Sequence, residues 1–135
     1  MLQTNLQHGE FDIKISGQVL VASLAGSWNE EAAHAFDREF RLAAEPLLGA
    51  PWAHLVYLDD WSLGVPEMKP VIEQLVVWCC EHGLKRAAQV YSASMLKTLQ
   101  LQDLVVEQGD FQRRAFATEQ QALQWLRAEG YDVAY

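Results

Sequence analysis

The sequence predicts a single α/β domain, a βα superhelix with a five-stranded, mainly parallel sheet, an N-terminal antiparallel hairpin and four helices. Two adjacent strand-like segments open the chain, and helix-like and strand-like segments alternate after them. Helices that alternate with strands require a parallel sheet with right-handed crossovers. The length of 135 residues fits one domain, which can bury roughly two-thirds of the surface that its unfolded chain exposes.

The first two strands are predicted from hydrophobic patterning. Residues 11–16 (FDIKIS) alternate apolar and polar side chains, the period of a half-buried strand. A turn at 16–18 follows, and residues 19–25 (VLVASLA) are almost wholly apolar, which suits a strand covered on both faces. These segments are therefore expected to form an antiparallel hairpin.

The first helix is predicted to begin after Asn29, a residue type that caps helices. Two glutamates follow in its first turn, where the helix dipole stabilises negative charge. Its apolar side chains recur at intervals of four, three and four: Phe36, Phe40, Ala43 and Leu47. This spacing lines one face of a helix. Pro46 marks its end, because proline disrupts a continuing helix.

The segment 54–58 is a short β-rich run that ends at two aspartates. Pro66 and Pro70 cannot both lie inside one regular helix, so an irregular turn over 65–69 is expected. A helix is predicted from about 70 to 82, with Gly83 just after its end.

The next strand is predicted at 86–91, and either Ser92 or Ser94 can cap the helix that follows. That helix carries the apolar residues Met95, Leu96, Leu99 and Leu104.

A last short strand is expected around 113–116. Thr118 with Gln121 then forms a capping box for a final helix that ends near Gly130.

Four motifs carry a resemblance to a known family: Gly26-Ser27-Trp28, LVYLDDWSLG at 55–64, RAAQVYSAS at 86–94 and FATEQQALQWL at 116–126. In this order they resemble STAS domains of the anti-sigma-factor-antagonist type, and more closely a SpoIIAA-like group of small stand-alone bacterial proteins. The resemblance covers about residues 10–130, which leaves 1–9 as a polar N-terminal tail.

The resemblance implies a module with no active site common to the family, used as a switchable binding partner or as a holder of a ligand. In the antagonists a kinase modifies a serine at the start of the second helix, within a pattern close to Asp-Ser-x-Gly. Ser62 and Gly64 keep the Ser-x-Gly part, which makes Ser62 the candidate phosphoacceptor. Trp61 stands where the antagonists have the aspartate, and the loop from Asp59 to Ser62 is shorter than theirs.

Composition and charge narrow the functions. The net charge of −8 disfavours binding to nucleic acid and to anionic lipid, because both are negatively charged. The first ten residues lack the features of a secretory signal, and the apolar run 75–80 is too short to cross a bilayer. Cys79 and Cys80 are adjacent and cannot form an ordinary disulfide, so they are expected to be reduced thiols. The sequence predicts a cytoplasmic protein that neither binds nucleic acid nor inserts into a membrane.

The candidate binding residues follow the predicted strands at their carboxyl ends, where open α/β sheets gather ligands and partners. They are Trp28, Asp59, Asp60, Trp61, Ser62, Gly64, Tyr91 and Ser92. Trp28, Trp61 and Tyr91 could wall an apolar pocket or a docking patch. The alternative is that the aspartates are turn residues and the tryptophans fill the core.

The sequence contains no recognisable catalytic or cofactor-binding motif. Ser62 is not part of a G-x-S-x-G elbow. His82 is expected at the C-terminus of its helix, where it would offset the helix dipole and not act as a catalytic base. Cys79 and His82 share a helical face but supply two of the ligands that zinc requires. Phosphate-binding glycine motifs do not occur in the sequence. We therefore expect no enzyme, no metal and no cofactor.

Two functions remain. The first is a non-catalytic STAS-like module that binds a protein partner, in a regulatory role, through the carboxyl ends of the strands. The alternative is a carrier or sensor of a small apolar, lipid-like ligand at the same edge. The helix over 70–82 has no polar stripe over 75–80, so either it is buried nearly all round or part of it contacts another protein, for which a homodimer through this helix is one candidate.

Overall fold

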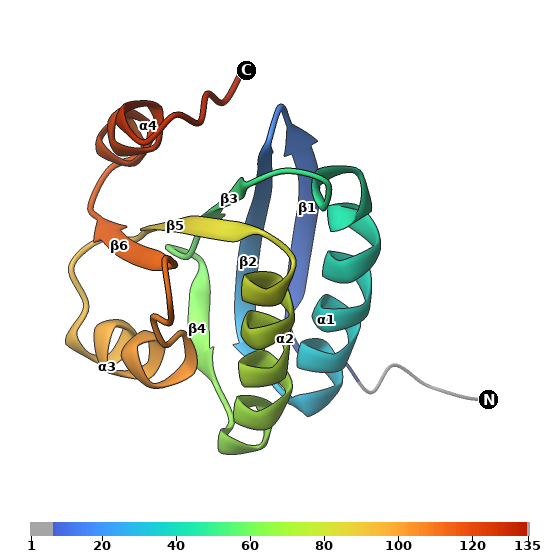
Figure 1. Cartoon of the computed structure of the whole chain (residues 1–135). Coiled ribbons are helices and arrows are strands. Elements are labelled where there is room, and N and C mark those ends of the chain that lie inside the picture. Colours follow the sequence, from blue (N-terminus) through green and yellow to red (C-terminus); the bar gives the residue numbers. More distant parts are fainter. Residues whose placement is uncertain (1–6, 135) are drawn as a thin grey trace.

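A mixed sheet carries the fold, and the computed structural model describes residues 7–134 of the chain. Residues 1–6 of the predicted N-terminal tail lie outside the described residues. The main path of the sheet runs β1-β2-β3-β5-β6 (Figure 1). The strands on it are β1 (Glu10–Ser16), β2 (Val19–Trp28), β3 (Trp52–Tyr57), β5 (Leu84–Val90) and β6 (Gln112–Phe116).

The predicted hairpin is present. β1 and β2 pair antiparallel from Ser16↔Val19 to Glu10↔Ala25. Gly17 takes a φ of 59° in the two-residue turn, a left-handed conformation that glycine adopts without a steric penalty. β2–β3, β3–β5 and β5–β6 are parallel pairs, so the prediction of a mainly parallel sheet is confirmed.

One strand was not predicted. β4 (Trp61–Gly64) pairs in parallel with the end of β2, through Gly26↔Trp61 and Trp28↔Gly64. The sequence indicated a loop here because four residues are too few for a clear alternating pattern. Trp28 and Trp61 therefore lie in strands and not in loops, which corrects the expectation for both residues.

Four helices complete the domain: α1 (Glu30–Ala44), α2 (Lys69–Glu81), α3 (Met95–Leu104) and α4 (Glu119–Ala128). Three of them begin at a side-chain cap. The side chains of Asn29, Ser94 and Thr118 accept from the backbone N–H three residues later. The irregular turn before α2 is a 3-10 turn over Pro66–Met68, and Gly83 follows α2 with a φ of 101°.

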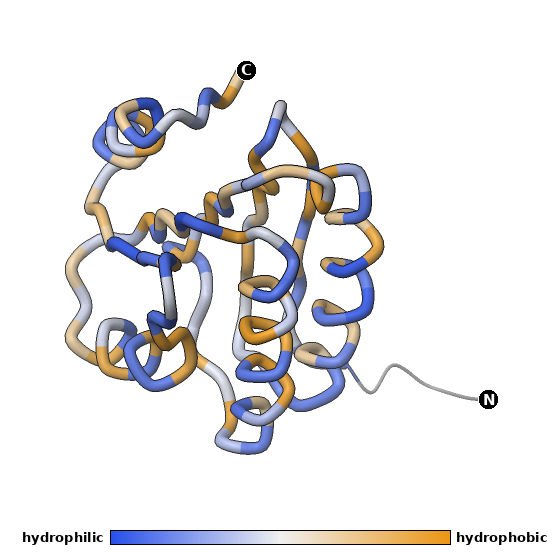
Figure 2. The backbone as a smooth tube through the Cα atoms, in the orientation of Figure 1, coloured by the Kyte–Doolittle hydropathy of each residue, from blue (hydrophilic) through white to orange (hydrophobic). Residues whose placement is uncertain are grey.

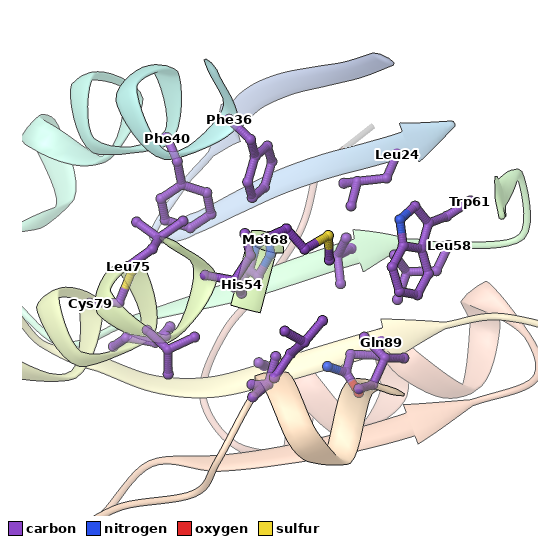
Figure 3. Close-up of a pocket in the computed structure, with 18 of the residues that line it drawn as sticks. Leu24, Phe36, Phe40, His54, Leu58, Trp61, Met68, Leu75, Cys79 and Gln89 are labelled. Atoms are coloured by element: carbon purple, nitrogen blue, oxygen red, sulfur yellow. The ribbon is translucent and has the colours of Figure 1, made fainter. Parts of the chain in front are cut away.

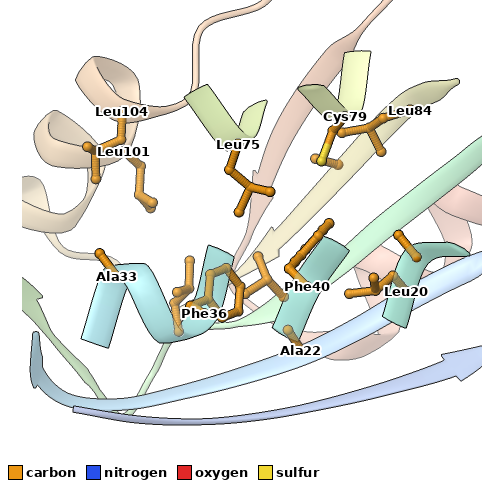
Figure 4. Close-up of a cluster of buried hydrophobic side chains, with 14 of the residues drawn as sticks. Leu20, Ala22, Ala33, Phe36, Phe40, Leu75, Cys79, Leu84, Leu101 and Leu104 are labelled. Carbon is orange, nitrogen blue, oxygen red and sulfur yellow. The ribbon is translucent and has the colours of Figure 1, made fainter. Parts of the chain in front are cut away.

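The helices cover the two faces of the sheet unequally. α1 and α2 lie side by side on one face, and α4 lies on the other (Figure 1). Hydrophobic and hydrophilic segments alternate along α1 and α2, as amphipathic helices require (Figure 2). The larger core lies under α1 and α2, with α3 contributing Leu101 and Leu104 (Figure 4). The smaller core joins the sheet to α4 through Ala122 and Leu126.

Candidate functional site

The predicted site residues gather at one end of the sheet, which we call the carboxyl edge: residues 26–28, 59–64 and 91–94. Asp59 and Asp60 form the turn between β3 and β4 and are exposed. The backbone N–H of Gly26 donates to the carbonyl of Asp60 at 2.9 Å. Oδ1 of Asp59 accepts from the backbone N–H of Ser92 at 2.7 Å. Three separate chain segments are thus joined at this edge.

Ser62 is exposed in β4, seven residues before α2 begins. Its position differs from the helix start that the resemblance implied. The next residue, Leu63, has a φ of 74°, an uncommon conformation for a branched side chain. Gly64 packs so closely that a Cβ there would lie 2.0 Å from Sδ of Met68. In the Ser-x-Gly stretch the backbone is therefore strained at Leu63, and a side chain at position 64 would have to displace the flexible end of Met68.

Side chains of α3 hold this segment in place. Nζ of Lys97 donates to the carbonyls of Leu58 and Asp59 at 2.7 and 2.9 Å. The side-chain amide of Gln100 donates to the carbonyl of Gly64 at 2.9 Å and accepts from its N–H at 3.1 Å. Sequence reasoning missed both residues, because a lysine and a glutamine inside a helix carry no pattern that identifies a distant partner.

Tyr91 is the candidate that connects β5 to α3. Its side chain is buried, with 5% exposed, and its hydroxyl lies 2.8 Å from Oγ1 of Thr98. Its ring does not belong with Trp28 and Trp61 in one pocket wall, because the cavity that those tryptophans line does not include Tyr91.

The first two turns of α3 expose large apolar side chains. Met95, Leu96 and Leu99 are 79%, 65% and 57% exposed, and we call these three residues the α3 patch. Positions 95, 96 and 99 share one side of a helix, while Leu101 and Leu104 turn into the core. Large apolar side chains this exposed and contiguous are typical of an interaction surface. The sequence predicted these residues on a helix but did not indicate which of them face solvent.

Trp28 and Trp61 line an internal cavity of about 100 Å³ under α1 and α2. Figure 3 shows the side chains around it, and the lining residues come from the sheet, from α1, α2 and α3, and from the segments before α2 and after α3. Apart from His54, Gln89 and the thiol of Cys79, the described lining side chains are hydrophobic. Trp28 is 1% and Trp61 2% exposed, so their rings can contribute to a pocket but not to an open docking patch.

The polar atoms of the buried rings differ in their partners. Nε1 of Trp28 donates to the carbonyl of Ala25 at 3.0 Å, and Nε1 of Trp52 donates to that of His82 at 2.8 Å. Nε1 of Trp61 has no hydrogen-bond partner among residues 7–134. Gln89, 2% exposed, accepts a 3.2 Å hydrogen bond from Arg113 through Oε1.

Burial sets the protonation states of two groups beside the cavity. Desolvation lowers the pKa of His54 from 6.5 to about 4, although a hydrogen bond between Nδ1 and the carbonyl of Leu20 opposes the shift. His54 is therefore neutral at pH 7. Desolvation also raises the pKa of the Cys79 thiol well above its usual range.

His82 lies far from the carboxyl edge, at the end of α2 that leads into the start of β5. Its Nδ1 lies 2.7 Å from the carbonyl of Trp78, and its ring stacks on the Trp78 indole. Ser62 and His82 are therefore not brought together. Within the described part of the chain, no group of three or more His, Cys, Asp or Glu side chains could hold a metal ion.

Comparisons with known proteins place the fold. No family model matches the sequence. No curated protein matches it either. An uncharacterised protein from Shewanella loihica with a SpoIIAA-like fold is similar at a TM-score of 0.66 and 16% identity, over 92% of this chain and 98% of that one.

Two anti-sigma factor antagonists are also similar. The unphosphorylated form of SpoIIAA matches at a TM-score of 0.56 and 13% identity, over 90% of this chain and all (100%) of that one. An antagonist from Mycobacterium paratuberculosis matches at 0.52 and 14% identity, over 88% and 94%. The chain therefore has the SpoIIAA-like fold of STAS-type proteins, as the sequence predicted. Among the described residues, no helix is both long enough and apolar enough to span a membrane.

Proposed function

We propose that the protein is a non-catalytic module that binds a protein partner through the carboxyl edge and the adjoining α3 patch. The observation that carries this proposal is the exposure of Met95, Leu96 and Leu99 on the outer face of α3. Removing such side chains from water on docking is favourable. Two structural neighbours are named anti-sigma factor antagonists, which describes interaction with another protein and not a reaction.

Charge around the α3 patch indicates the chemistry of the partner. Asp59 and Asp60 are exposed in the turn that Lys97 of α3 contacts, and the chain has a net charge of −8. A partner with an apolar centre and a basic rim would complement this surface, and its association would slow as salt screens the charges.

The test is site-specific photo-crosslinking in the cells that make the protein, with the crosslinker at Leu96 or, as a control, at Arg127 on α4. We expect one defined protein to crosslink at position 96 but not at 127. Leu96→Glu should abolish capture of that protein by the purified chain without loss of stability, because the side chain is 65% exposed. Equal crosslinking at both positions would contradict the proposal.

A regulatory role is proposed for Ser62, whose exposed hydroxyl follows Asp59 and Asp60. A phosphate there adds nearly two negative charges beside the two aspartates, and their repulsion is expected to disorder the turn. The Lys97 ammonium, bonded to Leu58 and Asp59, is a cation that α3 brings to the same turn. A phosphate that competes for Lys97 would loosen α3 and with it the α3 patch.

A homodimer through α2 is a further proposal for the partner. Val77 is 42% exposed on the outer side of α2, between the exposed Gln74 and Glu81. Arg41 from α1 lies 5.2 Å over the Trp78 ring and covers part of the remaining apolar surface. Sedimentation of the wild type and of Val77→Glu tests this interface. A monomeric wild type would rule out the dimer, and an α2 dimer should dissociate in the variant.

A second candidate function is favoured by the internal cavity. Its hydrophobic walls and its volume of about 100 Å³ suit a carrier or sensor of a small apolar ligand. Such a ligand would lie beneath α1 and α2, deeper than the exposed edge. Binding of a small hydrocarbon, followed by changes in tryptophan resonances or emission, tests this function.

A further inference from the structure

We propose that the cavity binds a small, neutral, ring-sized apolar molecule with one hydrogen-bond acceptor, whose oxygen accepts from the Nε1–H of Trp61. The inference rests on the ligand-carrying function and adds the chemistry of the ligand. It does not depend on docking at the α3 patch.

The indole N–H of Trp61 points to an acceptor. The ring is 2% exposed, and its Nε1 has no partner among the described residues. A buried donor without an acceptor is costly, and native proteins satisfy nearly all such groups. The buried indoles of Trp28 and Trp52 each donate to a backbone carbonyl. Trp61 therefore departs from the pattern that the same core sets elsewhere.

The donor lies where a ligand could reach it. Trp61 lines the cavity together with Leu24, Leu58 and Met68. Figure 3 shows the Trp61 ring at one end of the cavity, with its nitrogen on the edge turned toward Leu24 and Met68. A ligand whose acceptor lies against this edge would be surrounded mainly by hydrophobic side chains, apart from His54, Gln89 and Cys79.

The volume limits the size of the ligand. An apolar cavity of about 150 Å³ can bind benzene, so a cavity of about 100 Å³ suits a smaller molecule, such as a five-membered ring or a short branched chain. A full-length acyl chain is too large for it.

The walls limit the charge of the ligand. The described lining residues include no lysine or arginine, and the one histidine, His54, is neutral at pH 7. A carboxylate or phosphate would enter without a countercharge, which is strongly unfavourable in an apolar site. A neutral carbonyl or ether oxygen matches a single N–H donor.

Two probes of nearly the same shape separate the roles of ring and oxygen. Cyclopentanone carries the acceptor, and methylenecyclopentane replaces its oxygen with a CH₂ group. The measurement is a titration followed by the indole ¹H–¹⁵N resonances of the wild-type protein, with the Trp61 signal assigned by its loss in Trp61→Phe. We expect the ketone to shift the Trp61 N–H proton downfield. The Trp28 and Trp52 signals are internal controls, because both N–H groups already have acceptors.

Two variants complete the test. Trp61→Phe keeps an aromatic ring but removes the donor. The affinity for cyclopentanone should therefore fall by about 3- to 10-fold relative to the affinity for methylenecyclopentane. Ala87→Leu places a larger side chain into the cavity wall and should abolish binding of both probes. If Trp61→Phe does not fold, the Trp61 signal can be assigned by elimination, with variants of the other tryptophans. The titration of the wild-type protein then decides the question.

The outcomes are distinguishable. Binding of both probes without a downfield shift of the Trp61 N–H overturns the acceptor inference and leaves the ligand-carrying function standing. Binding of neither probe overturns both. A downfield shift produced by the ketone in the wild type, and loss of both probes in Ala87→Leu, supports both.

Discussion

The carboxylate of Asp59 accepts a 2.7 Å hydrogen bond from the backbone N–H of Ser92, and this contact ties the turn after β3 to the segment after β5. Lys97 adds two hydrogen bonds from α3 to the carbonyls of Leu58 and Asp59. The N-terminal half of α3, which carries the α3 patch, is therefore anchored to the turn that contains Asp59.

Asp59→Asn should lower stability slightly at pH 7 and make no difference at low pH. The pKa of Asp59 is held below 3.8, first because the Ser92 N–H donates to the carboxylate, with smaller contributions from the Ser92 hydroxyl and Lys97. A lowered pKa stabilises the fold above the unfolded value, and this contribution is lost as pH falls through the folded value. The side chain is exposed, so the difference should stay below about 1 kcal/mol.

The measurement is urea unfolding of both proteins from pH 7 to pH 3. Ser92→Ala removes the hydroxyl but keeps the backbone N–H and is the matched control. If the difference in unfolding free energy between Asp59→Asn and the wild type widens as pH falls, the lowered pKa of Asp59 is not the cause.

His54 should make the protein less stable in mild acid. Its pKa is lowered to about 4 by desolvation, so between that value and 6.5 the unfolded chain binds a proton that the folded chain does not. Stability is therefore lost as pH falls from about 6.5 towards 4, by at most about 3 kcal/mol. Denaturant unfolding at pH 7, 5.5 and 4 should show this loss. His54→Gln, which does not titrate, should show a smaller one, and parallel slopes would refute the role of His54.

Trp61→Ala should cost about 3 to 5 kcal/mol of unfolding free energy, the range for deleting a large buried aromatic side chain. The reason is that the ring is 2% exposed and packs in the main core. Leu96→Ala on the α3 patch is the control and should change stability by less than about 0.5 kcal/mol. A Trp61→Ala loss below about 1 kcal/mol would mean that the ring is not a core residue.

The two cysteines should react with a thiol reagent at different rates. Burial raises the pKa of both thiols, Cys79 is 2% exposed, and Cys80 is partly buried. Since the thiolate is the reactive form, native Cys80 should react slowly and Cys79 more slowly still. Mass spectrometry of labelled peptides measures both rates, and both sites should react fully in denaturant. Fast labelling of native Cys79 would be incompatible with its place in the core.

Ser62→Asp should weaken capture of the crosslinked partner, while Ser62→Ala should not. The added charge lies beside Asp59 and Asp60, and the hydroxyl itself is exposed, so neither variant should lose the fold. Circular dichroism and the capture assay are read together. If both variants retain the partner equally, Ser62 is an exposed residue of β4 and not a switch.

The parts of the fold that could be predicted are those set by patterns of a few residues close together in the sequence. The α1 cap at Asn29, the Gly17 turn and the Thr118 cap of α4 are local, and all three are present. β4 was missed because it is short and because its pairing partner, the end of β2, lies more than thirty residues away in the chain. Local periodicity contains no information about such a pairing.

For the candidate site residues, the sequence predicted their place in the fold but not their exposure. The carboxyl edge follows from strand order, so Asp59 and Ser92 were correctly placed together. Exposure could not be predicted, because in α3 the polar Lys97 and Gln100 turn toward the sheet while Leu96 faces solvent. Such an inversion arises when polar side chains bond to backbone groups of another segment.

The contact between Gln100 and Gly64 bears on self-association. The Gln100 amide donates to the carbonyl of Gly64 and accepts from its N–H, which is the pair of hydrogen bonds that a neighbouring strand would make. A strand with an unpaired edge is a template for aggregation through added strands. Because a helix side chain occupies this position on β4, the short strand cannot readily accept a strand from a second molecule. At Gly64 the glutamine therefore occupies the backbone groups through which β4 would pair with a further strand.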